Sequence, residues 1–100
     1  MAFGLIIEFT GTFDPGIYDA VNGKLGIDPK TGEGDWPPGL LSHAGGSTEN
    51  GFAVLEVWET KAQQEAFMND RLAEALQAGG APAPDRMEWV DLLAYRTPGG

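Results

Sequence analysis

The sequence predicts an α+β domain with the ferredoxin-like order β-α-β-β-α-β, in which one antiparallel four-stranded sheet carries two helices. Three observations lead to this fold class. Four apolar segments have the composition of strands, and two further segments have a helical period. An Asn-Gly pair stands between the second and third of the strand segments along the sequence. The chain has 100 residues, of which 42% are hydrophobic. We therefore expect a single domain over 1–97, followed by a short tail at 98–100.

The first strand and the first helix follow from composition and from capping residues. Residues 3–10 (FGLIIEFT) are apolar and β-branched, and Gly11 ends them. Asp14 is placed to cap a helix that has Pro15 at its first position, and Gly26 is placed to end that helix. The apolar face of this helix repeats every four residues and consists of Ile17, Tyr18, Val21 and Leu25.

Residues 28–38 (DPKTGEGDWPP) have the composition of a loop. Their acidic side chains raise the alternative of a calcium site, but Lys30 and Gly32 interrupt the alternating oxygen ligands of an EF-hand loop. We therefore expect no calcium here. Trp36 either covers a pocket or packs on the surface beside the two prolines that follow it.

The central hairpin is predicted from a turn signal. The segments 39–49 and 52–59 flank Asn50-Gly51, which is typical of a tight hairpin because both residues can adopt positive φ. Thr60 then begins a capping box for a second helix over 60–78. The apolar side of this helix carries Phe67, Met68, Leu72 and Leu76.

The chain closes its predicted sheet with one more strand. Gly79 is placed to end the second helix, and Pro82 prevents the helix from resuming. Residues 86–96 (RMEWVDLLAYR) then have the composition of the last strand.

A turn at Asn50-Gly51 sets His43 opposite Trp58 and Gly45 opposite Glu56. Opposed side chains share a face of the sheet. One face then carries Leu41, His43, Val54, Glu56 and Trp58, and the other carries Leu40, Ser42, Ala44, Ala53, Leu55 and Val57. An imidazole, a carboxylate and an indole beside the gap left by a glycine are typical of a pocket wall.

His43, the only histidine, has two interpretations at this point. It is either a hydrogen-bonded polar residue of a partly buried sheet, or an acid/base or ligand-binding group whose titration Glu56 tunes. Ser42 is excluded as its catalytic partner, because adjacent residues of a strand point to opposite faces. With one histidine and no cysteine, carboxylates would have to supply nearly all ligands of a zinc site, so we expect no metal.

Composition narrows the classes of partner. Six basic residues against fifteen acidic ones give a net charge of −9, which argues against nucleic acid and against anionic membranes. The apolar N-terminal run is interrupted by Glu8, so it is interpreted as a strand rather than a signal peptide or a membrane span. The absence of cysteine fits a cytoplasmic protein.

Two segments carry a family resemblance. PPGLLSH (37–43) and GFAVLEVWETKAQQEAFMNDRLAEAL (51–76), above all the step VLEVWET, resemble the antibiotic biosynthesis monooxygenase-like family of the dimeric α/β-barrel superfamily. The resemblance extends from Gly4 to about Tyr95. It implies a homodimer in which the Leu55 and Val57 face meets the partner, and a cavity in each subunit that the face of His43 and Trp58 lines.

The resemblance also implies a range of activities. Branches of the superfamily oxidise aromatic polyketides without metal or flavin, others cyclise polyketides, and one degrades haem. Trp58 matches a tryptophan of the oxygenase and haem-degrading branches. The haem-degrading branch also has an asparagine on its first strand and a histidine on its second helix, and residues 3–10 and 60–78 contain neither. Haem degradation is therefore disfavoured, and no cofactor is expected.

Three hypotheses follow for the function. In the first, a homodimer binds an apolar, aromatic or polyketide-like molecule and oxygenates or cyclises it. His43 or Glu56 removes a proton, and Trp58, Phe67 and Tyr18 hold the ring in a pocket that Gly45 opens. The second is a non-catalytic binding or accessory subunit with the same cavity. The third is a dimeric scaffold with a closed core.

Overall fold

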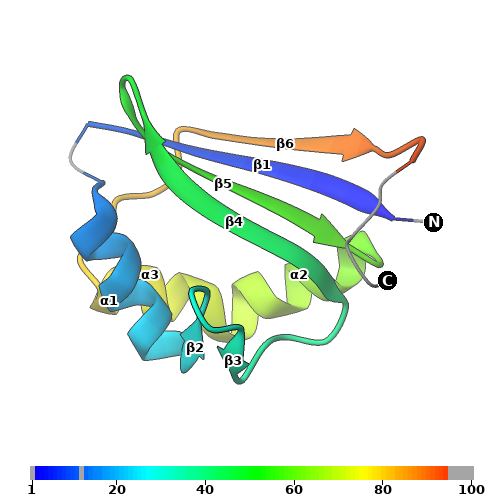
Figure 1. Ribbon diagram of the computed structural model, residues 1–100, viewed down its shortest axis with the longest axis horizontal. Coiled ribbons are helices and arrows are strands. Elements are labelled where there is room, and N and C mark those ends of the chain that lie inside the picture. The colour runs from blue at the N-terminus through cyan, green and yellow to red at the C-terminus, as the bar shows by residue number, and fades with distance from the viewer. Residues whose placement is uncertain (1, 12, 95–100) are drawn as a thin grey trace.

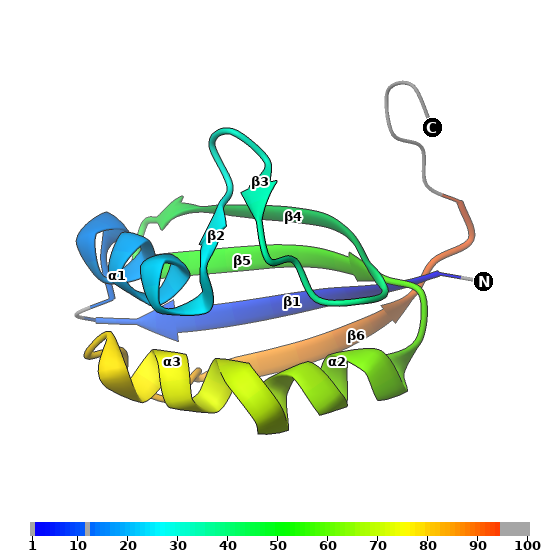
Figure 2. The ribbon, with the colours of Figure 1, turned by 90° about the horizontal axis from the view of Figure 1, so that it is seen from below.

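Four strands form one antiparallel sheet in the order β4-β5-β1-β6 (Figure 1). The computed structural model describes residues 2–11 and 13–94. The strands are β1 (Phe3–Thr10), β4 (Leu40–Thr48), β5 (Gly51–Trp58) and β6 (Arg86–Asp91). The helices all lie on one side of this sheet (Figure 2). The ferredoxin-like α+β class predicted from the sequence is thus confirmed.

The first helix, α1 (Pro15–Leu25), has the caps that the sequence predicts. The carboxylate of Asp14 accepts a hydrogen bond from the amide of Ile17 at 2.9 Å, which satisfies one of the free N–H groups of the first turn. Gly26 ends the helix in the left-handed conformation with φ 74°, where a glycine carries little strain.

The second helical segment differs from the single α-helix predicted over 60–78. It begins as α2 (Lys61–Phe67), continues as a π-helical segment η1 (Met68–Leu72) and ends as α3 (Ala73–Ala78). The hydroxyl of Thr60 accepts a hydrogen bond from the amide of Gln63, as the capping box predicts. A π-helical turn widens the helix by one residue, and Met68 and Leu72 of this one face the space between helices and sheet.

The register predicted for the hairpin is wrong by two residues. Thr48 pairs with Gly51, so Glu49 and Asn50 form the turn. The reason lies in Gly51, which pairs with Thr10 of β1, and a Cβ at this position would collide with the carbonyl oxygen of Phe9. This glycine therefore serves close strand packing, and its dipeptide does not form a turn with positive φ. No non-glycine among the described residues has positive φ.

The corrected register brings His43 opposite Glu56 and moves Gly45 opposite Val54. A shift of two residues keeps every side chain on its predicted face, because the side-chain period of a strand is two. The exception is a register irregularity between Leu40 and Ser42. It puts Leu40 opposite Trp58, on the helix side, and leaves Leu41 exposed, so the predicted places of these two leucines are exchanged.

The segment predicted as a loop at 28–38 is partly ordered into strands. The short strands β2 (Ile27–Asp28) and β3 (Glu33–Gly34) pair with each other. Trp36 donates its indole N–H to the carbonyl of Gly32 at 2.9 Å. Arg71 of η1 donates to the carbonyls of Leu25 and Asp35 at 2.8 and 2.7 Å, so η1 holds both the end of α1 and this segment.

The last strand is shorter than predicted, because β6 ends at Asp91 rather than at residue 96. Tyr95, Arg96 and the predicted tail at 98–100 lie outside the described residues. In the part of the chain that the structure describes, no helix is long and apolar enough to cross a membrane.

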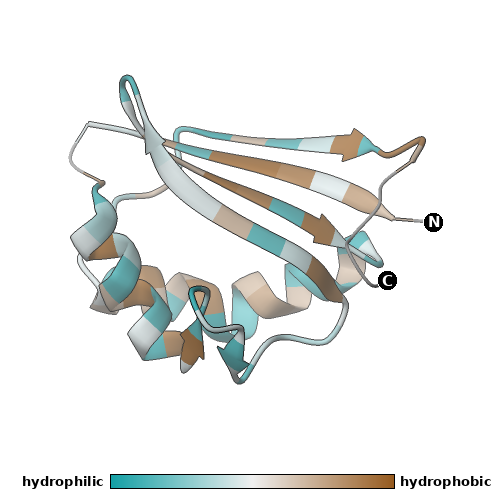
Figure 3. Ribbon diagram, viewed as in Figure 1, coloured by the Kyte–Doolittle hydropathy of each residue, from teal (hydrophilic) through white to brown (hydrophobic). Residues whose placement is uncertain are grey.

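The core lies between the sheet and the helices. Hydrophobic residues run along the two central strands, β1 and β5, whereas β4 is paler and more hydrophilic (Figure 3). The buried hydrophobic side chains are Leu5, Ile7, Phe9, Phe13, Val21, Leu25, Ile27, Phe52, Val54, Trp58, Phe67, Leu72 and Ala75. On the opposite face of the sheet, Leu55 and Val90 are exposed.

Candidate functional site

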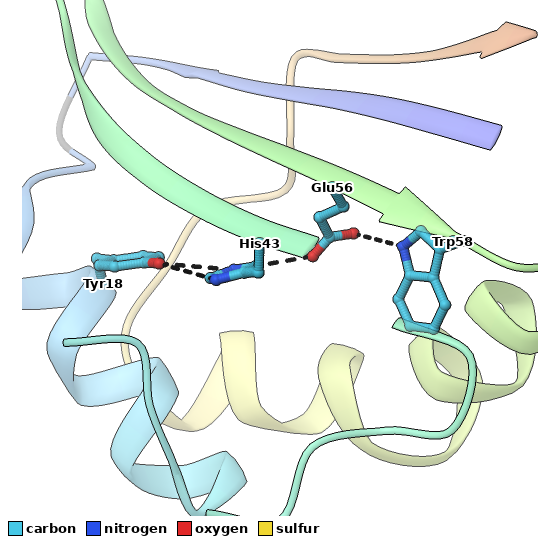
Figure 4. A network of polar contacts seen from close by, with 4 residues as sticks. All are labelled: Tyr18, His43, Glu56 and Trp58. Carbon is cyan, nitrogen blue, oxygen red and sulfur yellow. Dashed lines mark hydrogen bonds and ion pairs between the residues drawn. The ribbon is translucent and has the colours of Figure 1, made fainter. Parts of the chain in front are cut away.

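Four side chains from α1, β4 and β5 form a chain of polar contacts between the sheet and the helices (Figure 4). The hydroxyl of Tyr18 lies 3.3 Å from Nδ1 of His43. Nε2 of His43 lies 3.9 Å from Oε2 of Glu56, and the indole N–H of Trp58 donates to Oε1 of Glu56 at 2.9 Å. The two carboxylate oxygens therefore face different partners, the imidazole on one side and the indole on the other.

Glu56 is the buried acid of this chain. Its side chain points to the helix side of β5, where Glu56 is only 6% exposed. Burial raises the pKa of the Glu56 carboxyl from 4.5 to about 7, because the apolar surroundings disfavour the charged form, while the hydrogen bond from Trp58 opposes this rise. A carboxyl with a pKa near 7 both accepts and returns protons at neutral pH.

Burial shifts the pKa values of His43 and Tyr18, the other two titratable groups of this series of contacts, in opposite directions. It lowers the pKa of His43, so the imidazole is neutral at neutral pH. It raises the pKa of the Tyr18 phenol, an effect that the amide of Asn22 opposes and the charge of Glu56 reinforces. The arrangement therefore favours a neutral imidazole between a neutral phenol and a carboxyl that titrates.

A cavity of about 40 Å³ lies beside this series of polar contacts. A volume of this size holds roughly three water molecules and no aromatic ring. Its walls include the polar groups of Tyr18, Asn22, His43 and Glu56, and contain no lysine or arginine. The apolar remainder of the wall consists of Ile7, Phe9, Phe13, Val21, Leu25, Ile27, Leu40, Val54, Phe67, Met68, Leu72, Leu76 and Pro84.

Four of the six site residues predicted from the sequence line this cavity: Tyr18, His43, Glu56 and Phe67. Trp58 does not line it. Its side chain is fully buried, packs against Phe67 with ring centroids 5.8 Å apart, and reaches the site only through its hydrogen bond to Glu56. In this position Trp58 orients the carboxylate.

Gly45, the sixth predicted residue, does not leave an open space beside Glu56. It lies opposite Val54, and the ring of Tyr18 fills the space that the missing side chain leaves. A Cβ on Gly45 would lie 2.6 Å from Cζ of Tyr18, so the glycine is what allows the ring to approach β4.

Sequence reasoning missed one residue of the site, Asn22. Asn22 is buried on α1, lines the cavity and acts on the phenol of Tyr18. The signal was available, because Asn22 follows Tyr18 by four residues and so shares its helix face. Trp36, for which the sequence left pocket cover and surface packing as alternatives, packs against His43 with ring centroids 5.5 Å apart.

The donor set does not suit a metal. Within residues 2–11 and 13–94, no three histidine, cysteine, aspartate or glutamate side chains gather closely enough to hold an ion. His43 and Glu56 lie 3.9 Å apart, but they are two ligands where a protein site usually supplies at least three.

Comparisons with known proteins show what the chain resembles. No protein-family model matches the sequence, and no curated protein sequence is significantly similar to it. A solved structure of a putative antibiotic biosynthesis monooxygenase from Chloroflexus aurantiacus is 20% identical with a TM-score of 0.65, covering 99% of this chain and 100% of that chain. A protein of unknown function from Nitrosomonas europaea is 21% identical with a TM-score of 0.63, covering 99% and 94%. The chain therefore has the ferredoxin-like fold of an antibiotic biosynthesis monooxygenase-like protein, the fold that the resemblance in its sequence predicted.

Proposed function

We propose that this protein binds an apolar, ring-bearing molecule between its sheet and its helices and removes a proton from it, as the first step of a cofactor-independent oxygenation. The observation that carries the proposal is the buried pair of His43 and Glu56 at the wall of an otherwise apolar cavity. Perturbed titratable groups that face an apolar cavity are the usual mark of a site for proton transfer.

Glu56 is the base in this proposal. Its raised pKa makes its carboxylate a stronger base than an exposed one, whereas burial makes the imidazole of His43 a weaker base. Oε2 of Glu56, the oxygen that Trp58 does not engage, is free to take the proton. His43 and Tyr18 then hydrogen-bond the oxygen of the ligand on which negative charge develops.

The oxygenation balances without a metal or a flavin. Glu56 takes a proton from a ring CH₂ next to the aromatic system, and the resulting carbanion transfers electrons to O₂ to form a carbon–peroxide bond. The protonated carboxyl returns its proton to the outer peroxide oxygen. The O–O bond then breaks, the carbon loses its second hydrogen as a proton, and water leaves. One oxygen atom ends in the new C=O group and the other in water.

Turnover under air and under argon tests this proposal. We expect the protein to convert anthrone, a three-ring ketone with such a CH₂ group, to the quinone under air, with one O₂ consumed for each quinone formed. Oxygen uptake and absorbance measure the two quantities. Quinone formation that continues unchanged under argon would remove the oxygenase proposal, because no other oxidant is present.

A non-catalytic binding or accessory protein is the second candidate. The observation that favours it is the small size of the cavity, which leaves little room around His43 and Glu56 for a substrate and for O₂ together. Binding of anthrone without any turnover under air supports this candidate over the first.

We also propose that a second copy of the chain covers the open face of the sheet. Leu55 is 53% exposed there, and Val90 lies exposed on the same face, while the charged side chains of Glu8, Arg86 and Glu88 on this face form ion pairs with one another. Exposed apolar faces of this kind mark association surfaces, and the family resemblance implies a homodimer formed through this face.

Leu55→Glu is expected to convert the dimer to a monomer, because it buries an unpaired carboxylate in the interface. Sedimentation velocity at micromolar concentration measures the change. The matched control is Ala73→Glu, which adds the same charge on the exposed side of α3 and leaves the dimer intact. A wild-type protein that sediments as a monomer contradicts the proposal.

A further inference from the structure

We propose that Tyr18 is a gate, and that the ring-bearing ligand reaches His43 and Glu56 through a groove between α1 and β4 that Tyr18 closes. This inference rests on the proposed function, because the gate admits the molecule proposed there. A cavity of about 40 Å³ does not hold an aromatic ring, so at least one wall must move for the ligand to bind.

The groove lies on the outer side of Tyr18. It has a volume of about 430 Å³, which is enough for a ring system, and it runs past Pro15 and Asp19 of α1 to the end of β4. Tyr18 and His43 line both this groove and the inner cavity. The ring of Tyr18 therefore forms part of the partition between the two spaces, and its rotation joins them.

The contacts of Tyr18 suit a side chain that moves. Its ring lies against the backbone of β4 at Gly45 and packs against Phe52 with centroids 4.8 Å apart. Its hydroxyl makes only long contacts with the imidazole of His43, 3.3 Å to Nδ1 and 3.5 Å to Nε2. The side chain is half-buried, so one side of the ring already faces solvent.

A second route past Trp36 is less suited to this role. A depression of about 220 Å³ beside Trp36 also reaches His43, with Leu40 as the other residue it shares with the inner cavity. The indole of Trp36 is tied to Gly32 at 2.9 Å, and Arg71 ties the neighbouring backbone to η1. Opening this route breaks these shorter bonds, whereas opening the route at Tyr18 breaks the longer contacts between its hydroxyl and His43.

The rate of ligand binding tests the gate. We use N-phenyl-1-naphthylamine, a neutral dye that fluoresces in apolar surroundings, and follow its binding by stopped-flow fluorescence. The observed rate constant for the wild type is expected to level off with dye concentration, because gate opening limits it. Tyr18→Ala is expected to give a linear dependence with association about tenfold faster or more, since a gate of this kind is open at most about a tenth of the time.

Matched variants distinguish the effect of the Tyr18 ring on the association rate from the effect of its hydroxyl and from that of a loosened fold. Tyr18→Phe keeps the ring and is expected to remain gated. Gly45→Ala displaces the ring from β4 and is expected to speed association, whereas Gly46→Ala serves as its control, because a Cβ at Gly46 meets nothing within 4 Å. Trp36→Ala opens the second route and is expected to accelerate association less than Tyr18→Ala does.

The outcomes distinguish the gate from the function on which it rests. If the dye binds the wild type and Tyr18→Ala at the same rate, or if Trp36→Ala alone accelerates binding, the gate assignment is wrong while the binding function stands. If no variant binds the dye, Tyr18→Ala included, the proposed binding function itself fails, and the gate fails with it.

Discussion

Replacing Glu56 with glutamine is expected to remove about 3 kcal/mol of pH dependence from the free energy of unfolding between about pH 4 and about pH 8. In the folded protein the pKa of Glu56 stands at about 7, against an ordinary value of 4.5. Well below pH 4.5 the carboxyl is protonated in both states, so its ionisation does not lower the free energy of unfolding. As the pH rises toward 7, only the unfolded state ionises, so the folded state loses stability.

The measurement is urea denaturation of both proteins across this pH range, followed by tryptophan fluorescence. Glutamine does not titrate and still accepts the hydrogen bond from Trp58. The stability of the variant relative to the wild type therefore increases as the pH rises. His43 contributes in the opposite sense, because burial lowers its pKa and its contribution is lost as the pH falls, but both proteins share it. Glu59→Gln, at an exposed glutamate, is the control. A stability difference that does not change with pH contradicts the account of Glu56.

The same substitution is expected to reduce the kcat of anthrone oxygenation by roughly 10²- to 10⁴-fold, the range that a positioned general base contributes. In the wild type, kcat/KM is expected to rise with pH around a midpoint of about 7, because the carboxylate is the active form. The amide of glutamine cannot accept the proton, so the residual rate of the variant should lack this titration.

His43→Ala separates the two candidate bases. If Glu56 is the base, this variant turns over more slowly but keeps a rate that rises as a carboxyl ionises, because Glu56 remains in place. If His43 is the base, the titration is lost in His43→Ala and survives in Glu56→Gln. The pH profiles of the two variants under air, measured with the same substrate, therefore assign the role to one residue.

The fold was predictable because its determinants are local. Asp14 with Gly26, and Thr60 with Gln63, mark helix ends through bonds to nearby backbone. The sidedness of the strands was also predictable, since alternation survives a shift of two residues. For this reason His43 and Glu56 were placed on one face although their register was wrong.

The remaining features depend on contacts between distant segments. Gly51 carries the signal of a turn, but its role is set by the backbone of β1, more than forty residues earlier. The sequence predicts an open space at Gly45, because no pattern in β4 reveals that Tyr18 of α1 occupies it. The irregularity at Leu41 and the π-helical segment Met68–Leu72 likewise have no local sequence signature.

The titration of the Glu56 carboxyl tests the site most directly. Carbon-13 NMR of protein labelled at the glutamate side-chain carboxyls follows each group with pH, and the signal that Glu56→Gln removes belongs to Glu56. A midpoint at about 7 is the result expected for a buried carboxyl poised to exchange protons beside His43. A midpoint at the ordinary value of 4.5 would show a solvated carboxylate and would contradict both the proposed base and the pH dependence of stability.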